Sequence, residues 1–331
     1  MDGARLNRAA RAAFGGRALV DVRRLAGGTR KGVHRLTFAD GGSAVAYVWT
    51  PEENRWPERH DEADPADPFT ASAGPEPYLA AHRRLAALGL RTPEIFLVDG
   101  DVAIVEDFPG DTLMGRLAAD PAAAEPTVRQ LAGDLATMRA ARGPAYGKVS
   151  FVDGGGTPRE SSAERDALRY GRRMLAEAAA RDPRIAVHAA SIADRLSELC
   201  AAVRPRAEYS VVHGELGLDH VLVAPDGRPV LADTEDLMYF DVEWEHVFLR
   251  IRLGDDYRRL AVDDLDEGRF AFYLLVQRLS LTAGPLRLLA TGRAPDPAFM
   301  RRIAEINGAE AVRLCTGRTT RTATAPRRPS A

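Results

Sequence analysis

The strongest constraint on the fold of this chain is the separation of its strand-like and helix-like segments along the sequence. Five short segments are typical of β-strands, and all end before residue 107: residues 18–25, 33–38, 43–50, 95–98 and 102–105. One helical segment, residues 78–88, lies among them. The patterns beyond residue 112 are mainly helical, which predicts an α+β fold with a small antiparallel sheet first and a larger helical part second.

The boundaries of these parts carry their own signals. Residues 106–110, Glu-Asp-Phe-Pro-Gly, break the strand pattern, so we expect a first lobe over residues 1–107 and a second over 108–315. Residues 51–77 are polar, acidic and punctuated by proline, which predicts a long insertion for which mobility is one expectation. Residues 316–331 have no apolar period and are predicted to be a disordered tail.

The bulk properties argue against several classes of protein. The net charge of the 331 residues is −2, so no basic field attracts nucleic acid or an anionic membrane, and we expect neither as a partner. No run approaches 18 consecutive apolar residues, which argues against a membrane-spanning helix. Cys200 and Cys315 are too few for a disulfide framework, and we expect a soluble, cytoplasmic protein.

The second lobe has five segments with apolar residues at helical spacing: 124–141, 163–181, 187–203, 270–281 and 297–315. One stretch between them, residues 209–244, is instead dense in turns, short strands and carboxylates. Within it, a carboxylate loop is followed by a strand, a tight turn at Asp226 and Gly227, and a second strand that ends on a carboxylate.

This hairpin predicts a cluster of polar side chains. The start of the first strand lies beside the end of the second. Glu215 and His220, before the first strand, should therefore lie close to Asp233, after the second. Phosphoryl transfer needs such a cluster, in which one carboxylate orients the attacking hydroxyl and others hold the Mg²⁺ that neutralises the phosphates. Each residue alone is a weak signal, and their order and spacing favour this chemistry.

The same segment resembles the aminoglycoside phosphotransferase family, including its choline kinase and homoserine kinase relatives. The family motif is His-Gly-Asp, four residues, Asn, and a later Asp that precedes an aromatic residue and an acid. Residues 213–215, His-Gly-Glu, resemble its start, His220 stands where the Asn belongs, and residues 233–235, Asp-Thr-Glu, resemble its end. The resemblance covers residues 18–315, although only 211–245 are specific.

The resemblance implies a two-lobed, protein-kinase-like fold with ATP or GTP and Mg²⁺ as cofactors. It implies Glu215 as the catalytic base and His220 and Asp233 as the metal ligands, with His213 and Glu235 in supporting roles. The partner would be a small molecule that accepts the phosphoryl group on a hydroxyl.

The chain departs from the family pattern in the site itself. Glu215 replaces the aspartate, so its carboxylate reaches one methylene further, and Thr234 stands in the aromatic position. His220 replaces the asparagine, and an imidazole is a softer metal ligand than an amide oxygen. The family's third-strand lysine is missing, because residues 44–49 contain no basic residue. Glu76, the best candidate for the glutamate partner of that lysine, therefore has no strand lysine to meet.

One loop offers a replacement for the missing lysine. Gly28, Arg30 and Lys31 lie in the connection between the first two strands, which is expected to cover the nucleotide phosphates. We hypothesise that Lys31 or Arg30 supplies the positive charge from this loop. The alternative is that Lys31 is a solvated loop residue. Lysine is rare here, since only Lys31 and Lys148 occur among 45 basic residues.

Two further roles follow from the resemblance. The lobe-crossing segment offers backbone groups to the nucleotide base in the family, which here implies Glu106 and Phe108. In the family, an acidic residue near the position of residues 241–246 stabilises the catalytic loop, and Glu245 is the best match here. The alternative for the acids of this run is an ordinary helix start with a solvated acidic face.

The sequence does not identify the molecule that accepts the phosphoryl group. Asp219 and Asp236 are candidates for an acidic pocket, which would suit cationic acceptors such as aminoglycosides. Peptide antibiotics, nucleoside antibiotics, and the sugars, choline or amino alcohols of a metabolic kinase are equally compatible with the motif, because a fold does not fix the substrate.

Two functional hypotheses remain. The first is an active small-molecule kinase that could confer antibiotic resistance by phosphorylation. The second is a catalytically weak or inactive relative that binds nucleotide or ligand as a regulatory module, which the altered base, the altered metal ligand and the missing lysine favour. We prefer the first, because glutamate can still accept a proton and histidine can still bind a metal.

Overall fold

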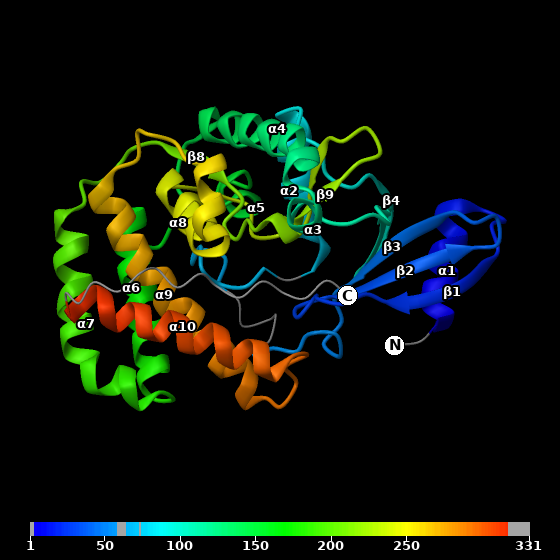
Figure 1. Ribbon diagram of the computed structural model, residues 1–331. Coiled ribbons are helices and arrows are strands. Elements are labelled where there is room, and N and C mark those ends of the chain that lie inside the picture. The colour runs from blue at the N-terminus through cyan, green and yellow to red at the C-terminus, as the bar shows by residue number, and fades with distance from the viewer. Residues whose placement is uncertain (1–2, 58–63, 73, 317–331) are drawn as a thin grey trace.

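The chain folds into a small β-sheet part followed by a larger helical part (Figure 1). The computed structural model describes residues 3–57, 64–72 and 74–316. Its helices are α1 (Gly3–Phe14), α2 (Pro75–Ala87), α3 (Leu113–Ala119), α4 (Pro121–Ala140), α5 (Val149–Val152), α6 (Ala163–Ala179), α7 (Pro183–Ala202), α8 (Val242–Leu253), α9 (Glu267–Ala290) and α10 (Pro297–Thr316). Its strands are β1 (Leu19–Arg24), β2 (Gly32–Phe38), β3 (Ser43–Val48), β4 (Ile95–Asp99), β5 (Val102–Glu106), β6 (Arg142–Gly143), β7 (Gly147–Lys148), β8 (Tyr209–Val212), β9 (Val221–Val223), β10 (Pro229–Leu231) and β11 (Met238–Phe240).

The first sheet is antiparallel, in the order β1-β2-β3-β5-β4. Successive side chains of β3 point to opposite faces. One face packs on α1 through residues such as Leu36 and Ala46, and the other carries Val45 and Tyr47 toward Tyr78 of α2. The five predicted strands and their antiparallel arrangement are confirmed. The sequence patterns assigned no element to α1.

The helical part contains two smaller sheets around which the helices pack. Strands β6, β8, β11 and β7 form a four-stranded sheet, and β9 and β10 form the predicted hairpin. A single large apolar core runs through this part and includes Phe240 of β11, Leu249 of α8 and Phe272 of α9. The predicted α+β class, with the sheet first and the helices second, is confirmed.

Helix α9 is much longer than the predicted segment, residues 270–281. Gly284 and Pro285 signal a helix end in the sequence, yet both are buried inside α9. A Cβ at Gly284 would lie 3.6 Å from the ring of Trp56, an ordinary van der Waals distance, so the insertion packs on this part of α9. Tertiary packing therefore overrides the local signal for a break.

The predicted insertion is fixed to the helical part over residues 64–72. Asp67 is buried and forms ion pairs with Arg169 and Arg173 of α6. Phe69 stacks on Tyr170 with ring centroids 4.5 Å apart. The mobility expected from composition is therefore not found there. Residues 58–63 and all of the predicted tail beyond Thr316 lie outside the described residues.

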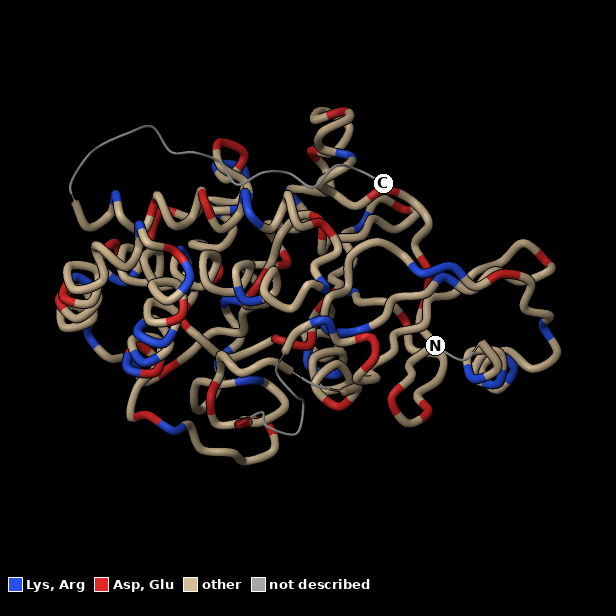
Figure 2. The backbone as a smooth tube through the Cα atoms, turned by 90° about the horizontal axis from the view of Figure 1, so that it is seen from below, with Lys and Arg blue, Asp and Glu red and all other residues tan. Residues whose placement is uncertain are grey.

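The surface and the helices carry both signs of charge. Figure 2 shows basic and acidic positions interspersed over both parts of the molecule. In the described ranges no helix is both long and apolar enough to cross a membrane.

Candidate active site

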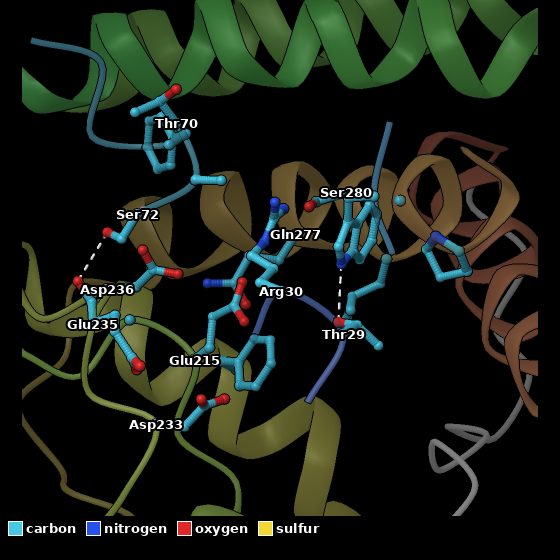
Figure 3. A pocket seen from close by; sticks show the side chains of 18 of the residues that line it. Thr29, Arg30, Thr70, Ser72, Glu215, Asp233, Glu235, Asp236, Gln277 and Ser280 are labelled. Atoms are coloured by element: carbon cyan, nitrogen blue, oxygen red, sulfur yellow. Dashed lines mark hydrogen bonds between the residues drawn. The ribbon is translucent and has the colours of Figure 1, made fainter. Parts of the chain in front are cut away.

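The predicted site residues gather at a cavity of about 630 Å³ between the first sheet and the helices. The cavity is walled by the β1–β2 loop, by residues 68–72, by the segments around β9 and β10, and by helices α6, α9 and α10 (Figure 3). Nine residues proposed from the sequence for the nucleotide, metal, catalytic or acceptor site line it: Gly28, Arg30, Lys31, Glu215, Asp219, His220, Asp233, Glu235 and Asp236.

The β9–β10 hairpin brings the two ends of the motif together. Leu231 pairs with Val221, and the backbone N–H of Ala232 donates to the carbonyl oxygen of His220 at 2.9 Å. Asp233 follows directly, and its Oδ2 lies 3.6 Å from Nε2 of His220. The predicted convergence of the carboxylate loop with the strand end is confirmed.

Asp233 has an unusual backbone conformation, with a φ of 58°. It is the one non-glycine residue with a positive φ in the part of the chain that the structure describes. Such a conformation costs about 1–3 kcal/mol and occurs where the surrounding structure enforces it, often at functional sites. Here both backbone polar groups of the preceding residue, Ala232, are hydrogen-bonded. Its N–H donates to His220, and its carbonyl oxygen accepts from Nε2 of His213 at 2.9 Å.

Lys31 enters the cleft from the β1–β2 loop. Gly28 has a φ of 53°, and a Cβ there would lie 2.6 Å from the carbonyl oxygen of Lys31, so this tight turn requires glycine. The turn directs Nζ of Lys31 to within 2.5 Å of both Asp233 Oδ1 and Glu235 Oε1. The ammonium also lies 5.1 Å from the ring centroid of Tyr47 on β3. Lys31 is buried, so the alternative of a solvated loop lysine is wrong.

This ion pair shifts the ionisation of its members. Burial alone would lower the pKa of Lys31, but the carboxylates of Asp233 and Glu235 outweigh burial and raise it. The Lys31 ammonium holds the pKa of Asp233 far below its usual range. Burial raises the pKa of Glu235 against the opposing effect of Lys31. Asp233 is therefore ionised at neutral pH, which is the form that binds a cation.

The second lysine of the chain holds the same segment, a contact that the sequence reasoning missed. Lys148 is buried, and its Nζ pairs with Asp236 and donates to Ser72 Oγ at 3.1 Å. Ser72 in turn donates to the carbonyl oxygen of Glu235 at 2.9 Å (Figure 3). In the sequence, only the rarity of lysine in an arginine-rich chain could have indicated a role for Lys148.

Glu215 presents an unpaired carboxylate to the cavity. Its side chain is exposed there, and among the described residues no hydrogen bond or ion pair reaches its carboxylate oxygens. The surrounding protein and the Asp236 carboxylate raise the pKa of Glu215, against the opposing effect of Arg30. Figure 3 shows Arg30 and Glu215 together near the centre of the cavity. A carboxylate with available oxygens and a raised pKa is suited to orient or deprotonate a hydroxyl.

His220 is oriented so that one ring nitrogen faces the acids. Its Nδ1 lies 3.1 Å from the carbonyl oxygen of Glu215, which can only accept, so Nδ1 is the donor. The other ring nitrogen, Nε2, is on the side of Asp233, 3.6 Å from its Oδ2. A second hydrogen bond of this kind is typical of metal-binding histidines. No cluster of three or more His, Cys, Asp or Glu residues suited to a metal occurs among the described residues, so a cation here would take the rest of its ligands from water or substrate.

Helix α8 supports the loop that carries Glu215. Glu245 is buried, and its Oε2 accepts from the backbone N–H groups of His213 at 2.5 Å and Gly214 at 3.2 Å. Nε1 of Trp244 donates to the carbonyl oxygen of Gly214 at 3.1 Å. Burial raises the pKa of Glu245 to about 7 and lowers the pKa of His213 to about 4.

The acidic start of α8 is not a solvated face, contrary to the alternative expectation. Asp241, Glu243 and Glu245 are all buried. Arg206 pairs with Asp241 and Glu243, and Asp241 also bonds Arg269. The helix start is therefore an internal ion-pair network.

Three predicted residues lie away from the cavity. Glu106 is bonded to Arg91 at 2.9 Å, and Phe108 packs against Ala224 and Val230, so neither side chain lines the cavity. Glu76 lies in the first turn of α2 rather than before it, and pairs on the surface with Arg83.

The acidic acceptor pocket suggested by Asp219 and Asp236 is neutralised by the protein itself. Asp219 accepts from Nη2 of Arg252 at 2.6 Å, and Asp236 pairs with Lys148. Arg252 and Lys148 also line the cavity, so these acids do not create a negative surface there.

The sequence matches the model of a known family, and the fold resembles that of solved structures. The model of the phosphotransferase enzyme family matches residues 21–283. No curated protein matches the sequence.

Several solved structures resemble the chain over nearly its full length. Choline kinase LicA from Streptococcus pneumoniae has a TM-score of 0.62 at 12% identity, with 95% of this chain and 99% of that chain covered. A thermostable mutant of aminoglycoside phosphotransferase APH(4)-Ia gives 0.60 at 16%, covering 92% and 98%. The GDP complex of aminoglycoside 2'-phosphotransferase-IIIa gives 0.60 at 17%, covering 94% and 99%. At these identities the likeness shows the fold, which is protein-kinase-like.

Proposed function

The chain belongs to the phosphotransferase enzyme family, and we propose that it transfers the γ-phosphoryl group of ATP or GTP to a hydroxyl of a small molecule. The observation that carries this proposal is the meeting of Glu215, His220, Asp233 and Lys31 at one end of an open cavity. Lys31 comes from the β1–β2 loop and the other three from the segments that flank the β9–β10 hairpin, so their convergence is a property of the folded chain.

Each residue has a role that its surroundings support. Glu215 orients the acceptor hydroxyl and takes its proton, because its oxygens are unpaired and its pKa is raised. Lys31 and Arg30 face the phosphates from the β1–β2 loop and stabilise their negative charge. Glu245 and Trp244 position Glu215 by holding the backbone of the preceding two residues.

The site fits a divalent cation. His220 and Asp233 would hold it, since Nε2 of His220 lies 3.6 Å from Oδ2 of the ionised Asp233. Mg²⁺ is commonly bound by one or two protein ligands together with phosphate oxygens and water, and it would neutralise phosphate charge here. Structural neighbours were crystallised with AMP-PNP and hygromycin B and with GDP, which supports a nucleotide at this site.

The Glu215→Gln variant tests the proposed chemistry. Without an acceptor, the wild type should hydrolyse nucleotide slowly with Mg²⁺, water taking the place of the acceptor. Loss of the base should lower that rate by about 10²–10⁴-fold and leave nucleotide affinity within twofold of the wild type. An unchanged hydrolysis rate in Glu215→Gln would refute the role of Glu215. A wild type that binds nucleotide but never hydrolyses it would favour the inactive, regulatory alternative.

A further inference from the structure

We infer that the acceptor is an uncharged hydroxyl compound with an apolar face rather than a polycation such as an aminoglycoside. This inference rests on the proposed function, because it concerns the acceptor of the same transfer. It follows from the charge balance of the cavity, from its aromatic wall and from the neutral polar groups of its floor.

The cavity has no excess of negative charge. Six carboxylates and six basic side chains line it: Glu177, Glu215, Asp219, Asp233, Glu235 and Asp236, with Arg30, Lys31, Lys148, Arg173, Arg252 and Arg287. Five of the six carboxylates are bonded to one of these lysines or arginines. The exception is Glu215, which the proposed chemistry reserves for the acceptor hydroxyl.

A polycationic acceptor would therefore find no unpaired carboxylate for its ammonium groups except Glu215. Bringing an ammonium into this cavity removes its hydration without a carboxylate in return, unless an existing ion pair breaks. One of the six basic groups, the Arg30 guanidinium, lies over the Trp56 ring with 4.6 Å to its centroid and places its positive charge near Glu215. The balance of charge disfavours cations.

Part of the cavity lining is an aromatic wall. Phe69, Tyr170 and Trp244 line the cavity together, and Phe69 lies 4.5 Å from Tyr170 and 4.9 Å from Trp244 between ring centroids. Phe69 and Tyr170 are only half-buried, so part of each ring faces the cavity. Such a surface stabilises a ligand by burying apolar area, at roughly 25 cal/mol per Å².

The aromatic wall is fixed in place by the insertion. Residues 64–72 deliver Phe69, and the Asp67 carboxylate on the same segment accepts the backbone N–H of Phe69 at 3.0 Å. Asp67 is in turn paired with Arg169 and Arg173 of α6. The wall is therefore positioned before a ligand arrives, which reduces the entropy cost of binding.

The floor from helix α9 offers neutral polar groups. Ser280 shares a 2.5 Å hydrogen bond with the hydroxyl of Tyr170 (Figure 3 shows Ser280 and Gln277 on α9). Gln277 donates through Nε2 to the carbonyl oxygen of Trp244 at 2.8 Å, while its Oε1 is buried and has no hydrogen-bond partner among the residues described. Hydroxyl and amide groups of this kind suit the O–H groups of a neutral ligand.

A matched pair of probes tests the inference by calorimetry. Phenyl β-D-glucoside is uncharged, whereas phenyl β-D-glucosaminide differs by one ammonium group. Titrated into the protein with AMP-PNP and Mg²⁺, the glucoside should bind at least fivefold more tightly than the glucosaminide. Equal affinities, tighter binding of the glucosaminide, or binding of neither probe would each overturn the inference.

Two variants locate the binding and its charge preference. Phe69→Ala should lower the affinity for the glucoside at least fivefold. The control is Phe96→Ala, which should not change this affinity, because Phe96 is a half-exposed residue of β4 outside the cavity. Ala71→Asp adds an unpaired carboxylate to the cavity lining and should raise the affinity for the glucosaminide relative to the glucoside. An unchanged affinity in either cavity variant would contradict the inference. If one of the two folds poorly, the other still tests it.

The outcome is distinguishable from a failure of the proposed function. AMP-PNP binding is measured separately, in the absence of either probe. If the nucleotide does not bind, the proposed function fails. If the nucleotide binds with Mg²⁺ but the glucosaminide is preferred, the kinase proposal stands and only the acceptor class is wrong.

Discussion

At the scale of single residues, the position of Lys31 is the most informative feature of the site. The β3 strand has no lysine, and the ring of its buried Tyr47 lies 5.1 Å from the Lys31 ammonium instead. The charge thus reaches Asp233 and Glu235 from a loop rather than from a strand. The sequence indicates this loop as one source of the charge, but the contact itself joins residues 202 positions apart, which no local pattern encodes.

Lys31→Met removes the cation while retaining much of the apolar chain. We expect nucleotide affinity to fall tenfold or more, and the free energy of unfolding to fall by about 2–3 kcal/mol, because Glu235 is left buried without its partner. Calorimetry with AMP-PNP and denaturant titration measure the two effects. Arg23→Met, at an exposed position of β1, is the control and should change neither. Wild-type affinity in Lys31→Met would show that the phosphates do not need this charge.

Glu245 predicts a pH dependence of stability. Its pKa is about 7 in the folded protein, above its ordinary value of 4.5, so between these pH values the folded state holds a proton that the unfolded state has lost. The protonated Glu245 carboxyl therefore contributes fully to the free energy of unfolding at low pH, and this contribution is lost as the pH rises through 7. Glu245→Gln keeps an acceptor for the N–H groups of His213 and Gly214 but cannot ionise.

The expected result is a pH-dependent difference between the two proteins. From pH 4 to pH 8, Glu245→Gln should gain about 3 kcal/mol of stability relative to the wild type, since one pKa unit is worth about 1.4 kcal/mol. Denaturant unfolding at several pH values measures it. A difference that is constant across this range would mean that the carboxyl titrates normally.

At the scale of elements, the sequence predicted what local periodicity encodes and missed what packing decides. The five strands of the first sheet and the β9–β10 hairpin follow from alternation and turn residues. Helix α9 was predicted too short, because Gly284 and Pro285 are helix breakers in isolation and are tolerated only in this packed setting. The role of residues 64–72 could not be read from composition, because polar side chains such as Asp67 are fixed by distant partners on α6.

Asp67→Asn tests how the insertion is held. Asparagine keeps an oxygen for the backbone N–H of Phe69 but loses the charge that pairs with Arg169 and Arg173. We expect a loss of about 1–3 kcal/mol of stability and faster hydrogen exchange across residues 64–72. Asp40→Asn breaks an ion pair on the surface and should leave both measurements unchanged. Unchanged exchange in Asp67→Asn would mean that the aromatic contacts alone fix the segment.

At the scale of the whole molecule, contacts from the sheet side of the cavity and from the insertion reach the helical side. Lys31 bonds the segment after β10, Ser72 bonds the Glu235 carbonyl, and Trp56 lies between the guanidinium groups of Arg30 and Arg287. The arrangement of a sheet part and a helical part follows from the sequence, as does the meeting of Glu215 with Asp233. The closure of the cavity does not follow from the sequence, because it depends on contacts between distant segments, and no local sequence pattern predicts these contacts.

The most direct test of the account is nucleotide binding in wild type and Asp233→Asn, measured as thermal stability with ATP and GTP, each with and without Mg²⁺. Asparagine tolerates the left-handed backbone at this position, so the substitution removes the charge with little added strain. A nucleotide at about 100 times its dissociation constant should stabilise the wild type by about 2.7 kcal/mol. The account predicts an Mg²⁺-dependent shift that is lost in Asp233→Asn. No shift with either nucleotide, or a shift that Asp233→Asn retains in full, would contradict it.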